Sequence, residues 1–147
     1  MAVASRLWAE PTRTQLALLG GERLLVILVD TSIWIDHLHN AEPRLVTLLT
    51  QDEIGCHHLV IEELALGSIK QRDVVLELLS NLHQFPTVTH AEILHLVEHR
   101  GLWGRGLSAV DVHLLGAVTL VDGAQLWTRD KRLKSVCAET GVPLAEE

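Results

Sequence analysis

Four acidic residues stand where predicted strands end or predicted helices begin: Asp30, Glu63, Asp111 and Asp130. A carboxylate isolated in a poorly solvated crevice is costly, so each of them needs a cation or hydrogen-bond donors to balance it. Carboxylates that share a site also raise one another's pKa unless a divalent cation lies between them. Because hard oxygen ligands without Cys or paired His favour Mg²⁺ or Mn²⁺, the predicted chemistry is metal-assisted hydrolysis of a phosphodiester.

The elements expected around these acids alternate between strands and helices, which predicts an α/β fold with a mainly parallel central sheet. An apolar run such as residues 24–29 (LLVILV) suits a strand that is buried on both faces. In such sheets the functional crevice lies beyond the carboxyl ends of the strands, and Asp30 stands at such an end. We expect strands at 25–30, 53–56, 85–88, 125–128 and 142–144, and helices at 33–39, 43–50, 59–69, 72–83, 90–102, from 108 onward and at 131–140.

Hydroxyl groups close to the acids in sequence extend the candidate site. Thr31 and Ser32 follow Asp30, and Thr128 precedes Asp130 by two residues, so these three side chains are predicted to orient the acids or a bound water.

Basic residues beside Asp130 are the candidates for contacts with phosphate. Arg129, Lys131 and Arg132, with Lys134, form the most basic stretch of the chain. A solvated helix surface explains this stretch about as well as binding to substrate. A second candidate is Trp103 with Arg100 and Arg105, on a glycine-rich loop.

Each acid also has a purely structural interpretation. Asp30 and Asp130 both precede a predicted helix, where a carboxylate caps the first turn or favours the helix dipole. Glu63 fits a solvated helix face. Asp111 completes a capping box with Ser108, and on local evidence this explanation is at least as good as catalysis. The grouping of all four acids at one sheet edge is therefore the stronger argument.

Length and composition indicate a single globular domain. The chain has 147 residues, 48% of them hydrophobic, and a formal charge of −7. Such acidity discourages binding to nucleic acid unless part of the acid holds metal ions. Apolar runs fall short of the roughly 20 residues that a membrane span needs, and the first residues do not make a signal peptide, so we expect a cytoplasmic protein without membrane contact. Residues 1–23 are interpreted as an N-terminal extension and 24–147 as the functional domain.

Four short motifs in this order resemble the PIN-domain ribonucleases, and most closely the VapC-type toxins of bacterial toxin-antitoxin pairs. They are DTSIWID at 30–36, ELALG at 63–67, SAVD at 108–111 and LWTRD at 126–130. The resemblance covers residues 25 to 145. It implies a compact PIN-like α/β/α sandwich, usually dimeric, that cuts RNA using Mg²⁺ or Mn²⁺ and is restrained by a cognate antitoxin.

The resemblance also assigns roles to the acids. Asp30 corresponds to the first acidic ligand, Asp111 to the third and Asp130 to a fourth that contacts metal less directly. The second corresponds to Glu63, with the adjacent Glu62 as the alternative. An apolar groove for the antitoxin would take in Trp34, Ile35 and Leu38, although a place in the core explains these residues better.

Other interpretations of the sequence remain open at this point. His95, Glu98 and His99 match an H-x-x-E-H pattern of zinc peptidases, but no third ligand is evident downstream. A PIN nuclease that processes RNA without an antitoxin would have the same acids. A noncatalytic α/β interaction module would use them to bind a cation for structure or regulation.

Overall fold

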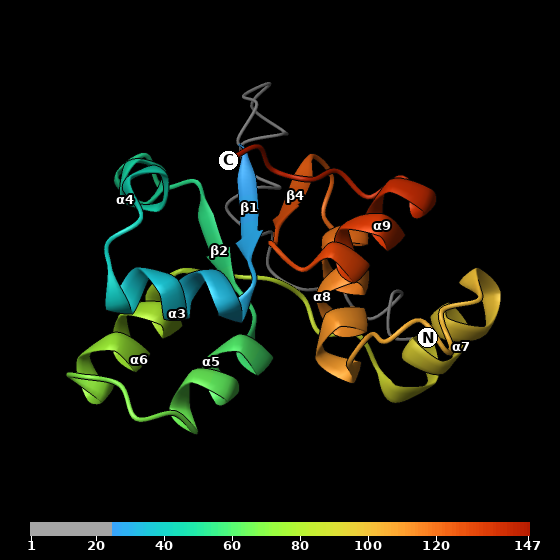
Figure 1. Ribbon diagram of the computed structural model, residues 1–147, viewed down its shortest axis with the longest axis horizontal. Helices are drawn as coiled ribbons and strands as arrows, with labels where there is room; N and C mark the ends of the chain where they lie inside the picture. Colours follow the sequence, from blue (N-terminus) through green and yellow to red (C-terminus); the bar gives the residue numbers. More distant parts are fainter. Residues whose placement is uncertain (1–24) are drawn as a thin grey trace, which may run out of the picture.

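The computed structural model describes residues 25–147, so the predicted extension at 1–23 lies outside the described residues. A parallel sheet of four strands forms its centre: β1 (Val26–Val29), β2 (Ile54–Cys56), β3 (His83–Gln84) and β4 (Ala124–Trp127) (Figure 1). The strand order is β3-β2-β1-β4. The chain therefore moves outward from β1 to β3 and then returns to place β4 on the other side of β1. In open parallel sheets the functional site lies at the carboxyl ends of the two strands between which the order reverses, here β1 and β4.

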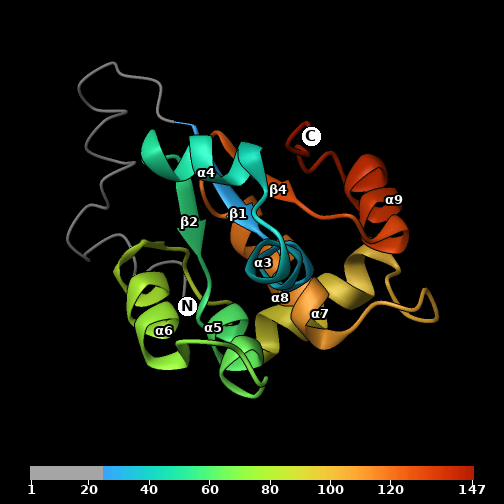
Figure 2. The same cartoon turned by 60° about the vertical axis from the view of Figure 1, so that its left-hand side comes forward.

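Helices cover both faces of the sheet, which gives the predicted α/β/α sandwich. In Figure 1, α3 to α6 gather on one side of the strands and α7 to α9 on the other. In the turned view of Figure 2, α5 and α6 still lie apart from α9. The helices are α3 (Thr31–His39), α4 (Pro43–Thr50), α5 (His58–Ala65), α6 (Arg72–Asn81), α7 (His90–Arg100), α8 (Ala109–Thr119) and α9 (Lys131–Thr140).

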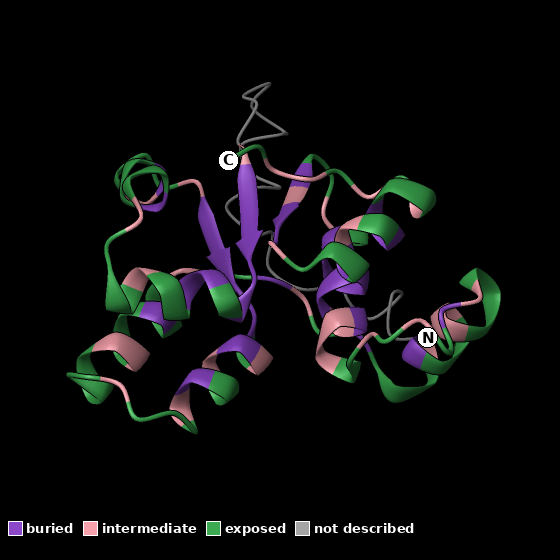
Figure 3. Ribbon diagram, viewed as in Figure 1, coloured by how far each residue is buried: buried purple, intermediate pink, exposed green. Residues whose placement is uncertain are grey.

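The core lies in and around the sheet. All four residues of β1 are buried, as the apolar run predicted for a strand covered on both faces (Figure 3). β1 pairs with β4 along its whole length, from Val26 opposite Ala124 to Val29 opposite Trp127. This rigid pair fixes the residues that follow each strand, Asp30 and Thr128, beside each other.

Two predicted strands differ from the structure, and proline explains both. The strand expected at 85–88 lies earlier, at His83–Gln84, and its ladder ends with the Phe85 N–H donating to the Cys56 carbonyl. Pro86 has no N–H with which to continue. The strand expected at 142–144 is reduced to a single bridge between Leu144 and Leu126 around Pro143.

Several helix ends also differ by a few residues. The helix expected at 33–39 begins at Thr31, and the one expected at 59–69 ends at Ala65. α7 ends at Arg100 because Gly101 follows with a left-handed φ of 62°. The predicted helix at 131–140 is confirmed.

Candidate active site

Asp30 stands at the carboxyl end of β1 with only 8% of its surface exposed. Its Oδ2 accepts two hydrogen bonds, from Thr128 Oγ1 at 2.9 Å and from Ser32 Oγ at 3.2 Å. Asp30 occupies the N-cap position of α3, but its carboxylate makes no side-chain capping bond. The capping interpretation of this side chain is therefore wrong. Two of the three predicted supporting hydroxyls, those of Ser32 and Thr128, donate to the carboxylate, whereas the Thr31 hydroxyl donates to Glu63.

The electrostatics of Asp30 show that the site favours positive charge. Burial raises the pKa of Asp30, and the nearby Asp111 carboxylate raises it further, against the opposing hydrogen bonds from Thr128, Ser32 and the Thr31 backbone. Removal from water and a like charge both disfavour the ionised form. A proton or a cation bound at this point would relieve both effects.

Asp111 reaches the site from the first turn of α8. The capping box is confirmed: Ser108 N–H donates to Asp111 Oδ2 at 2.9 Å, and Asp111 N–H donates to Ser108 Oγ at 3.1 Å. Capping and proximity to Asp30 are compatible, because the cap fixes the carboxylate at the start of α8. The capping box therefore does not exclude a catalytic role, and that role of Asp111 stays a prediction.

Glu63 comes from α5 and meets the site through Thr31. Thr31 Oγ1 donates to Glu63 Oε1 at 2.7 Å, and Thr31 itself is buried. This hydrogen bond is a long-range contact between α5 and the residue next to Asp30. Glu63, rather than Glu62, is the acid of this pair that contacts the residues around Asp30.

Asp130 follows β4 and begins α9. Its Oδ1 accepts from the Leu133 N–H at 2.9 Å, so the capping interpretation of this residue is confirmed. Its own N–H donates to Thr128 Oγ1 at 3.1 Å. Thr128 thus connects Asp130 to Asp30, and it is 2% exposed.

The residues present fit a hydrated divalent cation better than a closed protein cage. Within residues 25–147, no three His, Cys, Asp or Glu side chains are grouped closely enough to hold a metal ion. Asp30 and Asp111 form an electrostatically coupled pair, while Glu63 and Asp130 each lie one hydrogen-bonding residue away. Mg²⁺ typically binds one or two carboxylates and completes its shell with water and substrate phosphate, which suits this pair.

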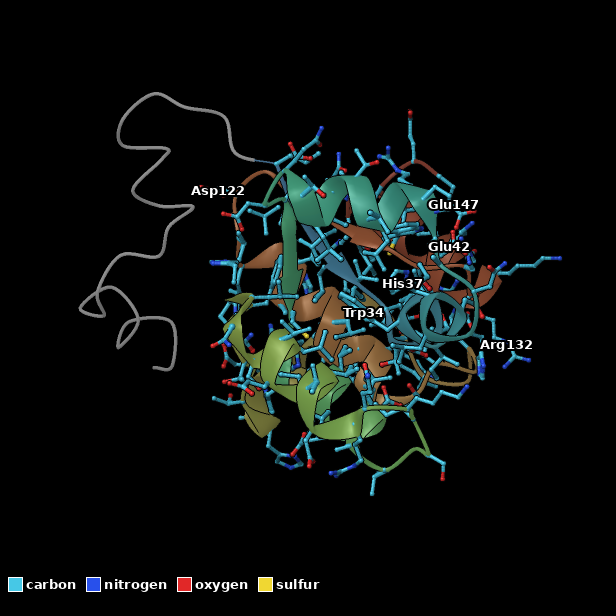
Figure 4. All side chains as sticks on the ribbon, turned by 90° about the vertical axis from the view of Figure 1, so that its left-hand side faces the viewer. Trp34, His37, Glu42, Asp122, Arg132 and Glu147 are labelled. Carbon is cyan, nitrogen blue, oxygen red and sulfur yellow. The ribbon has the colours of Figure 1, made fainter. Side chains whose placement is uncertain are left out.

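Arg129, a candidate for phosphate binding, is held by three carboxylates. Its Nη1 donates to Asp36 at 2.9 Å and to Glu42 at 2.8 Å, and its Nε donates to Glu147. Figure 4 shows Glu42 and Glu147 close together at the edge of the molecule. These ion pairs raise the pKa of Arg129. The sequence did not reveal this network, which joins α3, the start of α4 and the end of the chain.

The other basic candidates are less engaged. Lys131 and Arg132 are exposed at the start of α9, and Figure 4 shows Arg132 at the outer edge of the molecule. Arg132 Nη1 lies 3.5 Å from the Gly106 carbonyl, so it faces the loop that leads to Asp111.

His57 is a buried polar residue that sequence reasoning missed. It follows β2 as Asp30 follows β1, and this position is the signal that could have singled it out. Its Nδ1 accepts from the Leu59 N–H at 3.1 Å, whereas its buried Nε2 has no hydrogen-bond partner. Burial, with His58 and His113 nearby, lowers the pKa of His57 to about 4.

Comparison with known proteins agrees with this geometry. Residues 27–139 match the PIN domain family, so the chain belongs to the PIN-domain proteins. It is 73% identical to Ribonuclease VapC32 of Mycobacterium tuberculosis in both the CDC 1551 / Oshkosh and the H37Rv strains. Each alignment spans 122 residues, which is 83% of this chain and 98% of the relative.

Two further expectations bear on other functions. His95 and His99 lie one turn apart on α7 with stacked rings, 5.6 Å between centroids, and the family assignment excludes the zinc peptidase interpretation. No helix within residues 25–147 is long and apolar enough to cross a membrane.

Proposed function

We propose that this protein is a metal-dependent endoribonuclease toxin of a type II toxin-antitoxin pair. The observation that carries the proposal is the buried Asp30 beside Asp111 at the reversal of strand order. Membership of the PIN-domain family and the 73% identity to a protein named Ribonuclease VapC32 support the same conclusion.

In the proposed site, Asp30 and Asp111 are the principal ligands of the cation. Thr128 and Ser32 hold one oxygen of Asp30, and the capping box holds Asp111, so both carboxylates are oriented before a cation binds. Glu63 and Asp130 contribute from the outer side, as water-mediated ligands or proton acceptors. The proposed cofactor is Mg²⁺, with Mn²⁺ as the alternative, because the donor set consists of carboxylate and hydroxyl oxygens.

The reaction proposed is hydrolysis of an RNA phosphodiester. The oxygen of water forms a bond to phosphorus, one P–O ester bond breaks, and the water proton passes to a carboxylate while the leaving oxygen is protonated from solvent. A bound divalent cation supplies activation of the water and neutralises charge on the phosphate. The chain's own contribution is to fix the two carboxylates and to keep Asp30 largely out of bulk solvent.

Contacts with the RNA backbone are proposed for the start of α9. Lys131 and Arg132 are exposed there, next to Asp130. Arg129 would contact phosphate only by giving up one of its carboxylate partners. We therefore propose Lys131 and Arg132 ahead of Arg129 as the residues that bind substrate.

The proposed protein partners are a cognate antitoxin and a second copy of the chain, in the cytoplasm. An apolar surface on α3 and α4 supports an antitoxin contact, since Ile35, Leu38 and Val46 are 42%, 37% and 45% exposed. Trp34 is 5% exposed and belongs to the core instead.

Induced expression in a bacterial host tests the toxin function. We expect growth arrest and new RNA 5′ ends with the wild-type protein. The Asp30→Asn variant, expressed to the same level, should give neither. Equal arrest by both proteins would contradict the proposal.

A further inference from the structure

Trp103 is an exposed indole on the loop between α7 and α8. It is 64% exposed, whereas Trp34 and Trp127, the other tryptophans within residues 25–147, are 5% and 1% exposed. A single exposed apolar residue is ordinary on a protein surface. Trp103 differs from such a residue because its loop is held in a fixed conformation and lies next to the proposed active site.

The loop is built to hold Trp103 in one place. Gly101 and Gly104 flank it with left-handed φ values of 62° and 69°, which residues with a Cβ rarely adopt. Leu102, directly before Trp103, is 4% exposed and anchors the loop in the core. A Cβ on Gly101 would lie 3.8 Å from the indole ring, so the ring lies next to this glycine while most of the Trp103 surface stays exposed.

Two arginines fix the second half of the loop to α9. Arg105 donates from both Nη atoms to the two carboxylate oxygens of Glu139, at 2.6 and 2.8 Å. Arg132 packs against Gly106 so closely that a Cβ there would lie 2.9 Å from its side chain. Glu139 and Arg132 both belong to α9, so this half of the loop lies against that helix. An indole presented by such a fixed loop loses little freedom when a ligand binds.

The loop also borders the proposed active site. It leads directly into Ser108, whose capping box places Asp111, and Arg132 connects it to the helix that Asp130 caps. Cationic side chains are near: Arg132 faces the loop, and Arg100 ends α7 just before it. A polyanion that reaches the carboxylates along α9 would therefore lie beside the loop that carries this exposed aromatic ring.

We propose that Trp103 stacks on an unpaired nucleobase of the RNA substrate, beside the nucleotide that is cut. This inference rests on the proposed function and adds to it a residue that contacts the bases of the substrate. Stacking on an aromatic ring accepts any base because every base has a π-face. The loop would therefore distinguish unpaired from paired RNA without selecting one base.

RNA binding tests the proposal without requiring cleavage. Fluorescein-labelled oligo(U), and a duplex of oligo(U) with oligo(A), are titrated in fluorescence anisotropy with protein that carries Asp30→Asn, so that no RNA is cut. Adding Trp103→Ala should raise the Kd for oligo(U) by about 5- to 100-fold and change the Kd for the duplex much less. Trp103→Phe should restore most of the affinity. Leu94→Ala, which alters another exposed apolar residue, 56% exposed on α7, should bind as the parent does.

A spectroscopic arm reports on the indole itself. With Trp8 replaced by Phe, tryptophan emission should be quenched by oligo(U), and the quenching should disappear in Trp103→Ala. Unchanged oligo(U) affinity in Trp103→Ala, or equal weakening toward strand and duplex, would overturn the proposal. The proposal would also be overturned if Trp103→Ala changed only the self-association of the protein, as measured by sedimentation. Failure of the proposed function is a separate result, namely no RNA cleavage by the wild-type protein while the stacking signal persists.

Discussion

Replacing Asp30 by Asn should stabilise the metal-free protein while removing its activity. Thr128 and Ser32 both donate to the same oxygen of Asp30, so the amide oxygen of Asn can accept both hydrogen bonds. The amide NH₂ then takes the place of the other carboxylate oxygen. The substitution removes a charge from a position that is 8% exposed, and it replaces repulsion from Asp111 by a possible donor to that carboxylate.

We expect the substitution to raise the free energy of unfolding by about 1 kcal/mol, the usual net value of one hydrogen bond. Relief of the charge repulsion acts in the same direction. For a chain of this size a gain of about 1 kcal/mol raises the Tm by roughly 3 °C. Divalent cation should make the wild-type protein more stable than Asp30→Asn. At a free Mg²⁺ concentration ten times its Kd, binding stabilises the wild-type protein by about 1.4 kcal/mol and should leave Asp30→Asn almost unchanged.

Thermal unfolding by calorimetry in EDTA, and again with excess Mg²⁺, measures both effects. Asp122→Asn is the matched control, because Asp122 is exposed and precedes β4, so it lies at the opposite end of the parallel strands from Asp30. Its Tm should stay with that of the wild type. A Tm several degrees lower for Asp30→Asn in EDTA would refute the reasoning, since it would show that the carboxylate stabilises the fold by itself.

Three further predictions follow from single contacts. Because the folded-state pKa of His57 is lowered to about 4, the unfolded chain binds a proton near pH 6.5 and the folded chain does not. The free energy of unfolding should therefore fall by up to about 3 kcal/mol as the pH drops from 6.5 to 4; urea unfolding of His57→Asn should show a flatter profile. Thr128→Val removes a donor to Asp30 and should slow RNA cleavage about tenfold or more, whereas Thr128→Ser should retain most of the rate in the same assay. Gly55→Ala places a Cβ 2.4 Å from the Phe85 ring and should cost about 1–3 kcal/mol in denaturant unfolding.

The sequence predicted the parts of the fold that depend on local pattern. The apolar run before Asp30 indicated a strand buried on both faces, and β1 is such a strand. Ser108 and Asp111 indicated a helix start, and the capping box is present. The same local pattern misplaced β3. Phe85 and Val88 are apolar and suggested a strand, but Pro86 between them has no N–H to continue the ladder.

Contacts between distant residues were beyond such reasoning. The bond between Thr31 and Glu63 joins residues 32 positions apart, and only the packing of α3 against α5 creates it. Arg129 belonged to a basic stretch in the sequence, yet the structure surrounds it with carboxylates from three separate segments. Charge counted along the chain does not show which charges meet in space.

Single-turnover cleavage of an RNA panel by purified protein tests the central claim most directly, with Mg²⁺, with Mn²⁺ and with EDTA. If Asp30 and Asp111 hold the cation used for hydrolysis, the wild type and Asp122→Asn should cut only when divalent cation is present. Asp30→Asn and Asp111→Asn should remain folded and fail to cut. Cleavage that persists in EDTA, or that survives both substitutions at an undiminished rate, would contradict the account.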